Sequence, residues 1–357
     1  MDECRVTIAN TGASFSCGRG ETILDAALRQ GVMLPHNCRG GACGQCKADV
    51  VQGAVEHGWV MSFAITDEEK EEGRCLVCVS KPLGDAVTVS MHNPVPGADA
   101  QPIAPMATRA LVVSSVPLTP QIREITLALD PGCGFRFHAG MHVELGEEAG
   151  DGGRPYSIAT VPGADGAPPL GLLTVQVTLQ PGGRTSPWLH ENARVGAELT
   201  LRGPYGTFGC DPAVAGTDGL LLLAGGSGLA PLLSVAGDLL ANGFAAPLEL
   251  GLSVRTAADL FGVGELERLA RAHANFRYWA ALTRQEGDPP AAYCRAARVP
   301  DLLRERAAEL SGRRVLVAGP PGFVEACRGA LAALGVPADR VTAESYDNRA
   351  AHLRAAD

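Results

Sequence analysis

The first part of the chain alternates apolar and polar positions over short stretches, a pattern typical of strands. Residues 5–8 and 14–17 alternate in this way around the turn signal Asn10-Thr11-Gly12 and predict a hairpin. Thr22 and Asp25 form a capping box ahead of an apolar stripe with helical spacing, so a helix is expected there, ending at Gly31. A strand, an acidic helical turn and a closing strand are expected at 48–51, 67–72 and 87–89. Together these elements predict a small mixed fold.

The middle of the chain consists of alternating stretches separated by glycine and proline turns. The expected strands are 111–113, 122–129, 143–145, 156–159 and 174–179. Several short strands with glycine and proline turns between them predict an antiparallel barrel.

The last part changes period, because strand-like apolar runs alternate with helical patterns. Strands are expected at 220–224, 248–254, 278–282 and 315–318, and helices at 231–241, 265–274 and 323–334. Alternating strands and helices predict a doubly wound parallel sheet. The chain is therefore expected to combine α+β and α/β architecture in several domains.

Two breaks in composition predict the domain boundaries. Prolines and glycines crowd residues 92–106, which is typical of a semi-rigid linker. A weaker break lies at 211–219. We therefore expect domains at 1–92, 107–212 and 218–357, with a proline-rich linker at 93–106.

Composition narrows the function classes. The 357 residues are 46% hydrophobic and 19% charged, and they carry a formal charge of -9 without a basic stripe. Nucleic-acid and membrane-surface binding are therefore not expected. Residues 1–10 lack the apolar stretch of a secretory signal, and glycines interrupt the most apolar run, 220–233. These features predict a soluble, cytoplasmic protein.

Cysteine spacing gives the strongest chemical signal. Cys38, Cys43 and Cys46 form a C-x4-C-x2-C pattern, the plant-type spacing for a [2Fe-2S] cluster, and the glycines between them allow backbone N–H groups to fold around sulfur. Zinc or unrelated thiols are the alternatives, but zinc sites usually contain two short knuckles. A fourth ligand can come from Cys75 or Cys78, and the spacing leaves both open.

Two segments of the expected barrel carry groups suited to a flavin nucleotide. Arg154-Pro155-Tyr156-Ser157 offers a guanidinium for a pyrophosphate, a ring for a planar heterocycle and a hydroxyl for a ring nitrogen. Gly183-Arg184-Thr185-Ser186 opens an expected helix, whose first N–H groups can hold phosphate. Arg154–Ser157 alone also fits an ordinary barrel strand, and the two segments together favour a flavin nucleotide.

Two further segments fit a nicotinamide dinucleotide. A strand, a glycine loop and a helix follow one another at Gly225-Gly226-Ser227-Gly228, which is the context of dinucleotide binding although the spacing is not G-x-G-x-x-G. Gly319-Pro320-Pro321 ends a later strand in a similar turn and is expected to line the same crevice.

In this order, the motifs resemble those of the reductases of bacterial multicomponent oxygenases, in which a plant-type ferredoxin domain is fused to a ferredoxin-NADP-reductase-like module. The matches are R-x-Y-S at Arg154, G-x-x-S at Gly183, G-G-[ST]-G-x-x-P at Gly225 and the G-P-P of C-G-P-P at Gly319. Residues 184–192 look most like reductases of carbazole-type aromatic dioxygenases, and phenol and benzoate oxygenase reductases are similar in plan. The resemblance implies a β-grasp ferredoxin domain, an antiparallel barrel for FAD and a parallel-sheet domain for NADH.

The resemblance also implies residue roles. It favours Cys78 as the fourth cluster ligand. Arg154 would bind the FAD pyrophosphate, Tyr156 would stack on the flavin ring and Ser157 would hydrogen-bond N5, with Tyr346 of an E-x-F-like ending as a flavin cover. The nucleotide-binding residues would be Gly183, Ser186, Gly225, Gly226, Ser227, Gly228, Arg255, Gly319 and Pro320. No second basic residue adjoins Arg255 in the sequence, which favours NADH over NADPH.

The implied function is transfer of electrons from NADH through FAD and the [2Fe-2S] cluster to an oxygenase component or an intermediate ferredoxin. Alternatives are a reductase of the same plan for a diiron monooxygenase or a sugar deoxygenation, or a redox sensor. Ala318 replaces the family's cysteine before G-P-P, and residues follow Tyr346, so an exposed tail is the alternative to a flavin cover. Acidic residues in 1–92 suggest a basic partner, with solubility as the alternative.

Overall fold

The computed structural model describes residues 3–41, 43–62, 64–93, 95, 103–146, 153–209, 219–310 and 312–346. Outside these residues lie most of the predicted linker at 93–106, nearly all of the predicted break at 211–219, Ala42, Cys210 and the residues after Tyr346. Contacts divide the chain into two units, Met1–Met106 with Gly203–Thr207, and Ala107–Arg202 with Phe208–Asp357. The three predicted domain boundaries stay a prediction.

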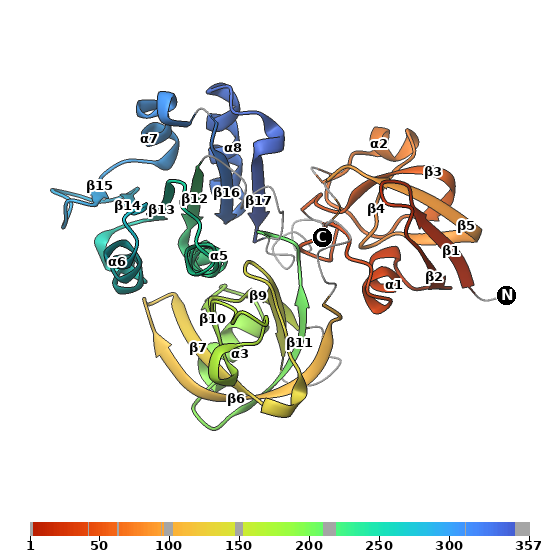
Figure 1. The fold of residues 1–357 in the computed structure, drawn as a ribbon, viewed down its shortest axis with the longest axis horizontal. Coiled ribbons are helices and arrows are strands. Elements are labelled where there is room, and N and C mark those ends of the chain that lie inside the picture. Colours follow the sequence, from red (N-terminus) through yellow and green to blue (C-terminus); the bar gives the residue numbers. More distant parts are fainter. Residues whose placement is uncertain are drawn as a thin grey trace. The chain divides into compact units, whose positions relative to one another are not determined.

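The first unit is built on one mixed sheet (Figure 1). Its strands are β1 (Glu3–Ile8), β2 (Ser14–Gly18), β3 (Lys47–Glu56), β4 (Arg74–Leu76) and β5 (Lys81–Met91), in the order β2-β1-β5-β3-β4. The expected hairpin is present, because β1 and β2 pair antiparallel, whereas β1 and β5 are parallel. Two helices, α1 (Ile23–Arg29) and α2 (Asp67–Glu71), match the predicted helix and acidic turn.

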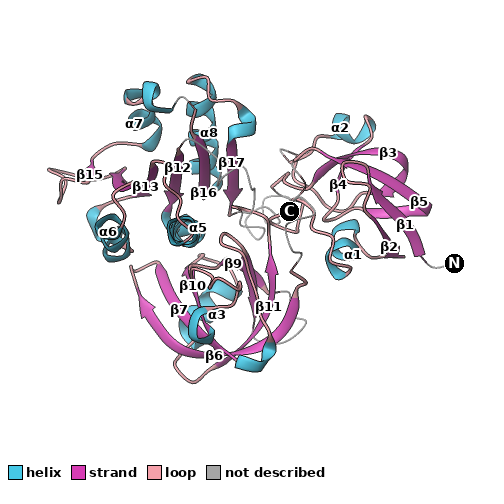
Figure 2. Cartoon of the chain, viewed as in Figure 1, coloured by secondary structure: helices cyan, strands magenta, loops and turns pink. Residues whose placement is uncertain are grey.

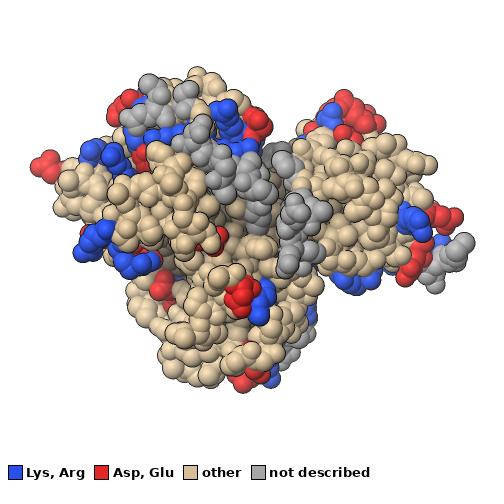
Figure 3. All heavy atoms as spheres, viewed as in Figure 1, with Lys and Arg blue, Asp and Glu red and all other residues tan. Residues whose placement is uncertain are grey.

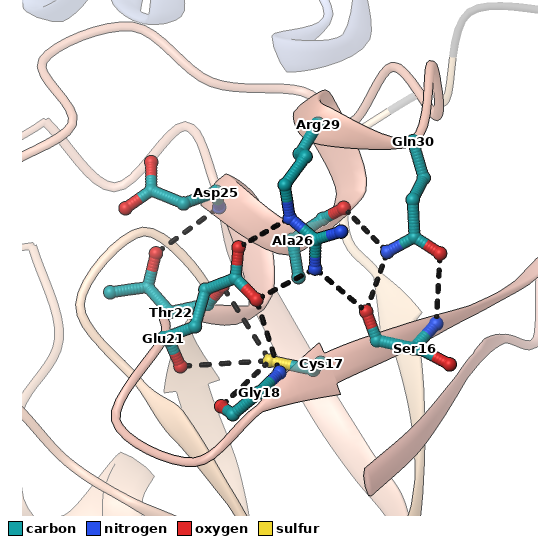
Figure 4. A network of polar contacts seen from close by, with 9 residues as sticks. All are labelled: Ser16, Cys17, Gly18, Glu21, Thr22, Asp25, Ala26, Arg29 and Gln30. Atoms are coloured by element: carbon teal, nitrogen blue, oxygen red, sulfur yellow. Dashed lines mark hydrogen bonds and ion pairs between the residues drawn. The ribbon is translucent and has the colours of Figure 1, made fainter. Parts of the chain in front are cut away.

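Polar contacts fasten α1 to β2 (Figure 4). Thr22 caps the helix by accepting a hydrogen bond from the Asp25 N–H at 3.1 Å. The Glu21 carboxylate accepts from the Arg29 guanidinium at 2.9 Å and from the Gly18 N–H at 3.0 Å. These contacts join both ends of a short helix to the strand before it, which positions the loop that follows.

The second unit contains the predicted barrel. Strands β6 (Met106–Pro117), β7 (Ile122–Leu129), β8 (His142–Gly146), β9 (Arg154–Ser157), β10 (Leu172–Thr178) and β11 (Glu198–Tyr205) form a sheet in the order β10-β7-β6-β11-β8-β9. An isolated bridge between Ile158 and Val175 joins the two ends of this sheet, so the barrel is nearly closed. Helix α3 (Thr185–Asn192) lies between β10 and β11 in the chain.

The second unit also contains the predicted parallel sheet, in the order β15-β14-β13-β12-β16-β17. These strands are β12 (Leu220–Gly225), β13 (Leu248–Val254), β14 (Phe276–Leu282), β15 (Cys294–Arg295), β16 (Arg314–Gly319) and β17 (Val341–Ser345), and every neighbouring pair is parallel.

Helices cover both faces of this parallel sheet (Figure 2). Side chains of α5 (Leu229–Ala241) and α6 (Val263–Ala272) share one buried cluster with alternate strand residues such as Leu222. Those of α7 (Val299–Glu305) and α8 (Pro321–Ala333) share a second cluster with the intervening residues, such as Leu223. The sheet is therefore doubly wound, as expected. In the described parts of the chain, no helix is long and apolar enough to cross a membrane.

Candidate electron-transfer site

The four cysteines of the predicted cluster site lie together in the first unit. The thiols of Cys43 and Cys78 both contact Cys38, and Cys78 also contacts Cys46. Hydrogen bonding with Cys38 and burial raise the pKa of Cys43 well above its ordinary value, and contacts with Cys38 and Cys46 do the same for Cys78. Four grouped thiols are the donor set of a [2Fe-2S] cluster, so the residues present fit that group.

Cys75 occupies a different place. It lies on β4 opposite Ala48 and is fully buried. Burial raises the pKa of its thiol to about 12, and Cys46 is the one cysteine that adds to this shift. The structure thus groups Cys78, and not Cys75, with Cys38.

The backbone of the cysteine loop is shaped for sulfur. The Gly40 N–H points at the Cys38 sulfur at 3.4 Å. Gly41 has a left-handed φ of 76°, and a Cβ there would collide with the carbonyl oxygen of Trp59. The Met61 N–H donates to the Gly41 carbonyl at 3.0 Å, so residues 59–61 lie directly against the loop.

Sequence reasoning missed two residues that hold the same loop. The side chain of His36 is buried, with Nδ1 2.7 Å from the Leu34 carbonyl, and its Nε2 accepts a hydrogen bond from the Gly206 N–H at 2.8 Å. Burial lowers the pKa of His36 to about 4, which fits a neutral ring accepting at Nε2. The Arg39 guanidinium lies 3.9 Å from the centre of the Tyr205 ring and 2.9 Å from Asp25. Because their partners Gly206 and Tyr205 lie far away in the sequence, no local sequence pattern marks His36 and Arg39.

In the second unit, Ser157 ends β9 and meets the last described residues. Its hydroxyl lies 3.2 Å from the Tyr346 hydroxyl and 3.5 Å from Oε1 of Glu344. The Tyr346 N–H donates to the Gly319 carbonyl at 3.0 Å, which fixes this ending beside β16. Burial raises the pKa of Tyr346 well above its ordinary value, so the phenol keeps its proton. Glu344 was absent from the predicted site, although the E-x-F pattern contained it.

Arg154 and Tyr156 lie on the same strand. Tyr156 is opposite Val143, and burial raises the pKa of its phenol. Arg154 is exposed opposite Leu145, and among the described residues it forms no ion pair. A neutral aromatic ring two residues from an unpaired guanidinium suits a planar ring carrying phosphates.

Gly183 and Ser186 stand at the start of α3. The Ser186 hydroxyl is buried and accepts a hydrogen bond from the Gln180 N–H at 3.0 Å, while a Cβ at Gly183 would press on the Gln180 carbonyl at 3.1 Å. The turn is therefore held tightly at the helix N-terminus, where N–H groups lack helical partners.

The glycine loop after β12 packs against the turn after β16. A Cβ at Gly228 would collide with the carbonyl oxygen of Ala318, and one at Gly225 would lie 2.7 Å from the Phe323 ring. Gly226 has a left-handed φ of 54° and faces open space. The Thr178 hydroxyl of β10 donates to Ser227 at 2.7 Å. The structure thus brings Gly225–Gly228 together with Gly319 and Pro320 at the carboxyl edge of the sheet, the edge at which nucleotides bind.

Arg255 follows β13 at the same edge. Its guanidinium contacts Asp259 at 2.6 Å. Burial alone would raise the pKa of Asp259, but hydrogen bonds from Arg255 and Thr256 outweigh it and lower the pKa. The backbone N–H of Arg284 donates to the Arg255 carbonyl at 2.7 Å, so the chain after β14 runs beside Arg255. The negative charge of the Asp259 carboxylate would repel the 2'-phosphate of NADPH.

Comparisons with known proteins agree with this geometry. Residues 6–83 match the model of a 2Fe-2S iron-sulfur cluster binding domain, and residues 222–329 match that of an oxidoreductase NAD-binding domain. The reductase component of phenol 2-monooxygenase from Pseudomonas sp. strain CF600 is 34% identical over 321 residues, covering 90% of this chain and 88% of the relative. The aromatic O-demethylase reductase subunit of Amycolatopsis sp. is 33% identical, covering 88% and 90%.

Two solved structures are similar over almost the whole chain. A cytochrome P450 reductase of Amycolatopsis is 30% identical, with a TM-score of 0.78 over 96% of this chain and 98% of the other. The ferredoxin reductase in carbazole 1,9a-dioxygenase is 25% identical, with a TM-score of 0.69 over 97% and 98%.

Proposed function

The chain belongs to the family of iron–sulfur flavoprotein reductase components of multicomponent oxygenases, and on that basis we propose which residues hold each redox group and which protein accepts the electrons. It is an NADH-dependent oxidoreductase that transfers electrons from NADH through FAD and a [2Fe-2S] cluster to an oxygenase component. When bound, the flavin accepts two electrons from NADH and releases them singly, and the cluster carries one at a time.

We propose that Cys38, Cys43, Cys46 and Cys78 ligate the cluster. The observation that carries the proposed function is that these four thiols lie together on the same chain as a nucleotide-binding sheet. His36 and Arg39 fix the loop through their contacts with Gly206 and Tyr205, and would thereby keep the four sulfurs in position around a bound cluster. Gly40 supplies an N–H donor to sulfur, which favours the reduced cluster by stabilising its added negative charge.

We propose that the flavin lies against β9. Arg154 would bind its pyrophosphate and Tyr156 would stack on its ring, while Ser186 and Gly183 shape the turn at α3 for phosphate. Ser157 would hydrogen-bond the reacting edge, and Tyr346, whose hydroxyl lies 3.2 Å from that of Ser157, would cover it. Glu344 adds a carboxylate to this group and gives the serine a second partner.

We propose that NADH binds at the carboxyl edge of the parallel sheet. Gly225, Gly226, Ser227 and Gly228 would receive its phosphates, Gly319 and Pro320 would form the opposite wall, and Arg255 would lie on the adenosine side. Asp259 supports NADH over NADPH, because its carboxylate lies 2.6 Å from the arginine that a 2'-phosphate would need.

For the acceptor, we propose the oxygenase component of a monooxygenase, which takes electrons directly from the cluster of this chain. Relatives at 34% and 32% identity are the reductase components of phenol 2-monooxygenase and of an alkene monooxygenase system, and both are matched over most of their length. Their names support a monooxygenase over a dioxygenase.

An anaerobic titration of the purified chain with NADH tests whether electrons pass from NADH through the flavin to the cluster. We expect NADH to bleach both flavin and cluster absorption, and Cys43→Ser to lose the cluster bands while flavin bleaching persists. Cys75→Ser is the matched control and should retain the cluster, because Cys75 lies apart on β4. Flavin bleaching without any cluster signal in the unsubstituted chain would contradict the proposal. A Cys75→Ser variant that keeps its flavin bands but lacks the cluster bands would reassign the fourth ligand.

A further inference from the structure

One large aromatic side chain lies exposed on the first unit. Trp59 is 48% exposed, and in the described part of the chain it is the one aromatic among the exposed large hydrophobic side chains. Tryptophan is the residue most enriched among those that dominate protein–protein binding, and its burial removes much apolar surface from water. Its position relative to the cysteines indicates what it binds.

The segment that carries Trp59 contacts both parts of the cysteine site. On one side, the Met61 N–H donates to Gly41 at 3.0 Å, and the Trp59 carbonyl leaves no room for a Cβ at Gly41. On the other side, a Cβ at Gly58 would collide with the carbonyl oxygen of Val79, the residue after Cys78. Trp59 therefore lies at the rim of the cluster site, between the loop 38–46 and Cys78.

The neighbours of Trp59 hold it in place. Val60 and Met61 are partly buried and pack against the core of the first unit, while the Ala64 and Ile65 N–H groups donate to the Met61 carbonyl at 2.9 and 3.2 Å. The backbone is thus anchored on its inner side. An anchored, exposed aromatic loses little conformational entropy when a partner covers it.

Acidic side chains follow the Trp59 segment in the chain. Helix α2 follows the turn at Met61 after a few residues, and Figure 3 shows acidic groups gathered there. Glu68 and Glu71 are exposed, and within the described residues neither forms an ion pair, whereas Asp67 is paired with Lys70 at 2.7 Å. An apolar centre beside unpaired carboxylates is complementary to an apolar patch beside lysines or arginines.

We propose that Trp59 is the apolar anchor of the surface on which the electron-accepting protein docks. The acceptor is a redox protein whose electron-entry face combines an apolar patch with surrounding cations. Electron transfer needs a short distance between centres, so a partner that takes electrons from the cluster must cover its rim. The inference rests on the proposed function and adds to it the residue and the chemistry of the partner.

Cytochrome c, a basic haem protein, serves as the probe. Each NADH reduces two ferric cytochromes and yields NAD⁺ and a proton, so atoms and electrons balance. We expect Trp59→Ala to lower kcat/KM for cytochrome c by roughly tenfold or more, the effect typical of a lost interfacial tryptophan. Trp59→Phe should retain most of the rate. Rising salt should slow the unsubstituted chain because carboxylates steer the basic probe.

Leu83→Ala is the matched control. Leu83 is 49% exposed on β5, opposite Ala54, and no described contact links it to the cysteine loop. The Leu83→Ala substitution should therefore leave the rate of cytochrome c reduction unchanged. In all three variants NADH should still bleach the cluster at the unsubstituted rate, which shows that electrons reach the cluster normally.

The outcomes separate the two proposals. If NADH bleaches both chromophores but Trp59→Ala and Leu83→Ala reduce cytochrome c equally fast, the proposed docking surface is contradicted. Electron transfer from NADH through the flavin to the cluster is then still supported. Slower cluster bleaching in Trp59→Ala would also overturn docking, because the side chain would then act within the chain. If NADH bleaches neither chromophore in the unsubstituted chain, the proposed function fails and the docking surface with it.

Discussion

Glu249 is a buried carboxylate whose charge is fully paired. It lies on β13, is 6% exposed and accepts hydrogen bonds from Trp279 at 2.5 Å, from Arg313 at 3.0 Å and from both terminal nitrogens of Arg306. Burial alone would raise its pKa, but the bonds from Arg306, Trp279 and Arg313 outweigh it and lower the pKa below 4.5. The ionised form is therefore the one that stabilises the fold.

We expect Glu249→Gln to destabilise the chain by about 3 kcal/mol near neutral pH, since it leaves two arginines facing a neutral group. A lowered folded pKa gives stability that is present above the ordinary pKa of 4.5 and is lost as the pH falls through the folded value. Thermal melts at pH 7 and pH 4 should therefore show a Tm difference from the unsubstituted chain that shrinks on acidification.

Glu267→Gln is the control for this measurement, because Glu267 forms an exposed helical pair with Arg271 at 3.0 Å. Surface pairs of this kind contribute little, so its melting temperature should stay close to the unsubstituted value at both pH values. A Tm difference for Glu249→Gln that is the same at pH 7 and pH 4 would show that its charge is not the cause.

At the scale of elements, the nucleotide edge depends on how closely two turns approach. The glycine loop after β12 meets the end of β16 because Gly228 has no side chain, so Ala318 and the loop touch through backbone atoms. Ala318 itself is fully buried. Where the related reductases are expected to have a cysteine, this chain has a buried methyl group.

Gly228→Ala should displace the glycine loop, because its Cβ would overlap the Ala318 carbonyl. We expect KM for NADH to rise about tenfold or more, in line with a lost phosphate contact of charge-assisted strength, while FAD content stays the same. Gly264→Ala on α6 is the control, since a Cβ there meets nothing within 4 Å. Steady-state kinetics with ferricyanide measure both, and an unchanged KM in Gly228→Ala would remove the loop from the nucleotide site.

Strand β11 was missed although its Leu199-Thr200-Leu201-Arg202 alternates and glycines flank it at Gly196 and Gly206. The other missed strands, β4, β15 and β17, are short. An alternation of buried and exposed side chains can be recognised only over several residues, which these short strands do not provide. They form because each pairs with a longer neighbour, β3, β14 or β16. Helix α7 has seven residues, as α1 has, but it lacks the side-chain cap that marked α1 in the sequence.

At the scale of the whole molecule, the redox groups are assigned to separate units. The cluster cysteines belong to the first unit, whereas Arg154, Tyr156 and the nucleotide loops belong to the second. Each unit has its own buried core, one around the mixed sheet and others around the parallel sheet. Loss of one cofactor therefore should not unfold the site of the other.

Tyr156→Ala tests this independence. Without the ring against which the flavin stacks, we expect the purified chain to lose FAD absorption and NADH oxidation, while the cluster bands remain. Visible spectroscopy and iron content per chain measure the two groups separately, and Tyr156→Phe should retain FAD. Loss of iron together with FAD in Tyr156→Ala would contradict the independence of the two units.

The sequence by itself determined the fold class, the long strands and helices and the chemistry of each motif, because period, turn residues and cysteine spacing are local properties of the chain. Strands such as β7 and β13 end where the pattern predicted. Only the tertiary structure decided which distant groups meet: Cys78 with Cys38, Ser157 with Glu344 and Tyr346, His36 with Gly206, Arg255 with Arg284, and Trp59 with the cluster loop. Such contacts depend on sheet order and packing, which no local pattern encodes.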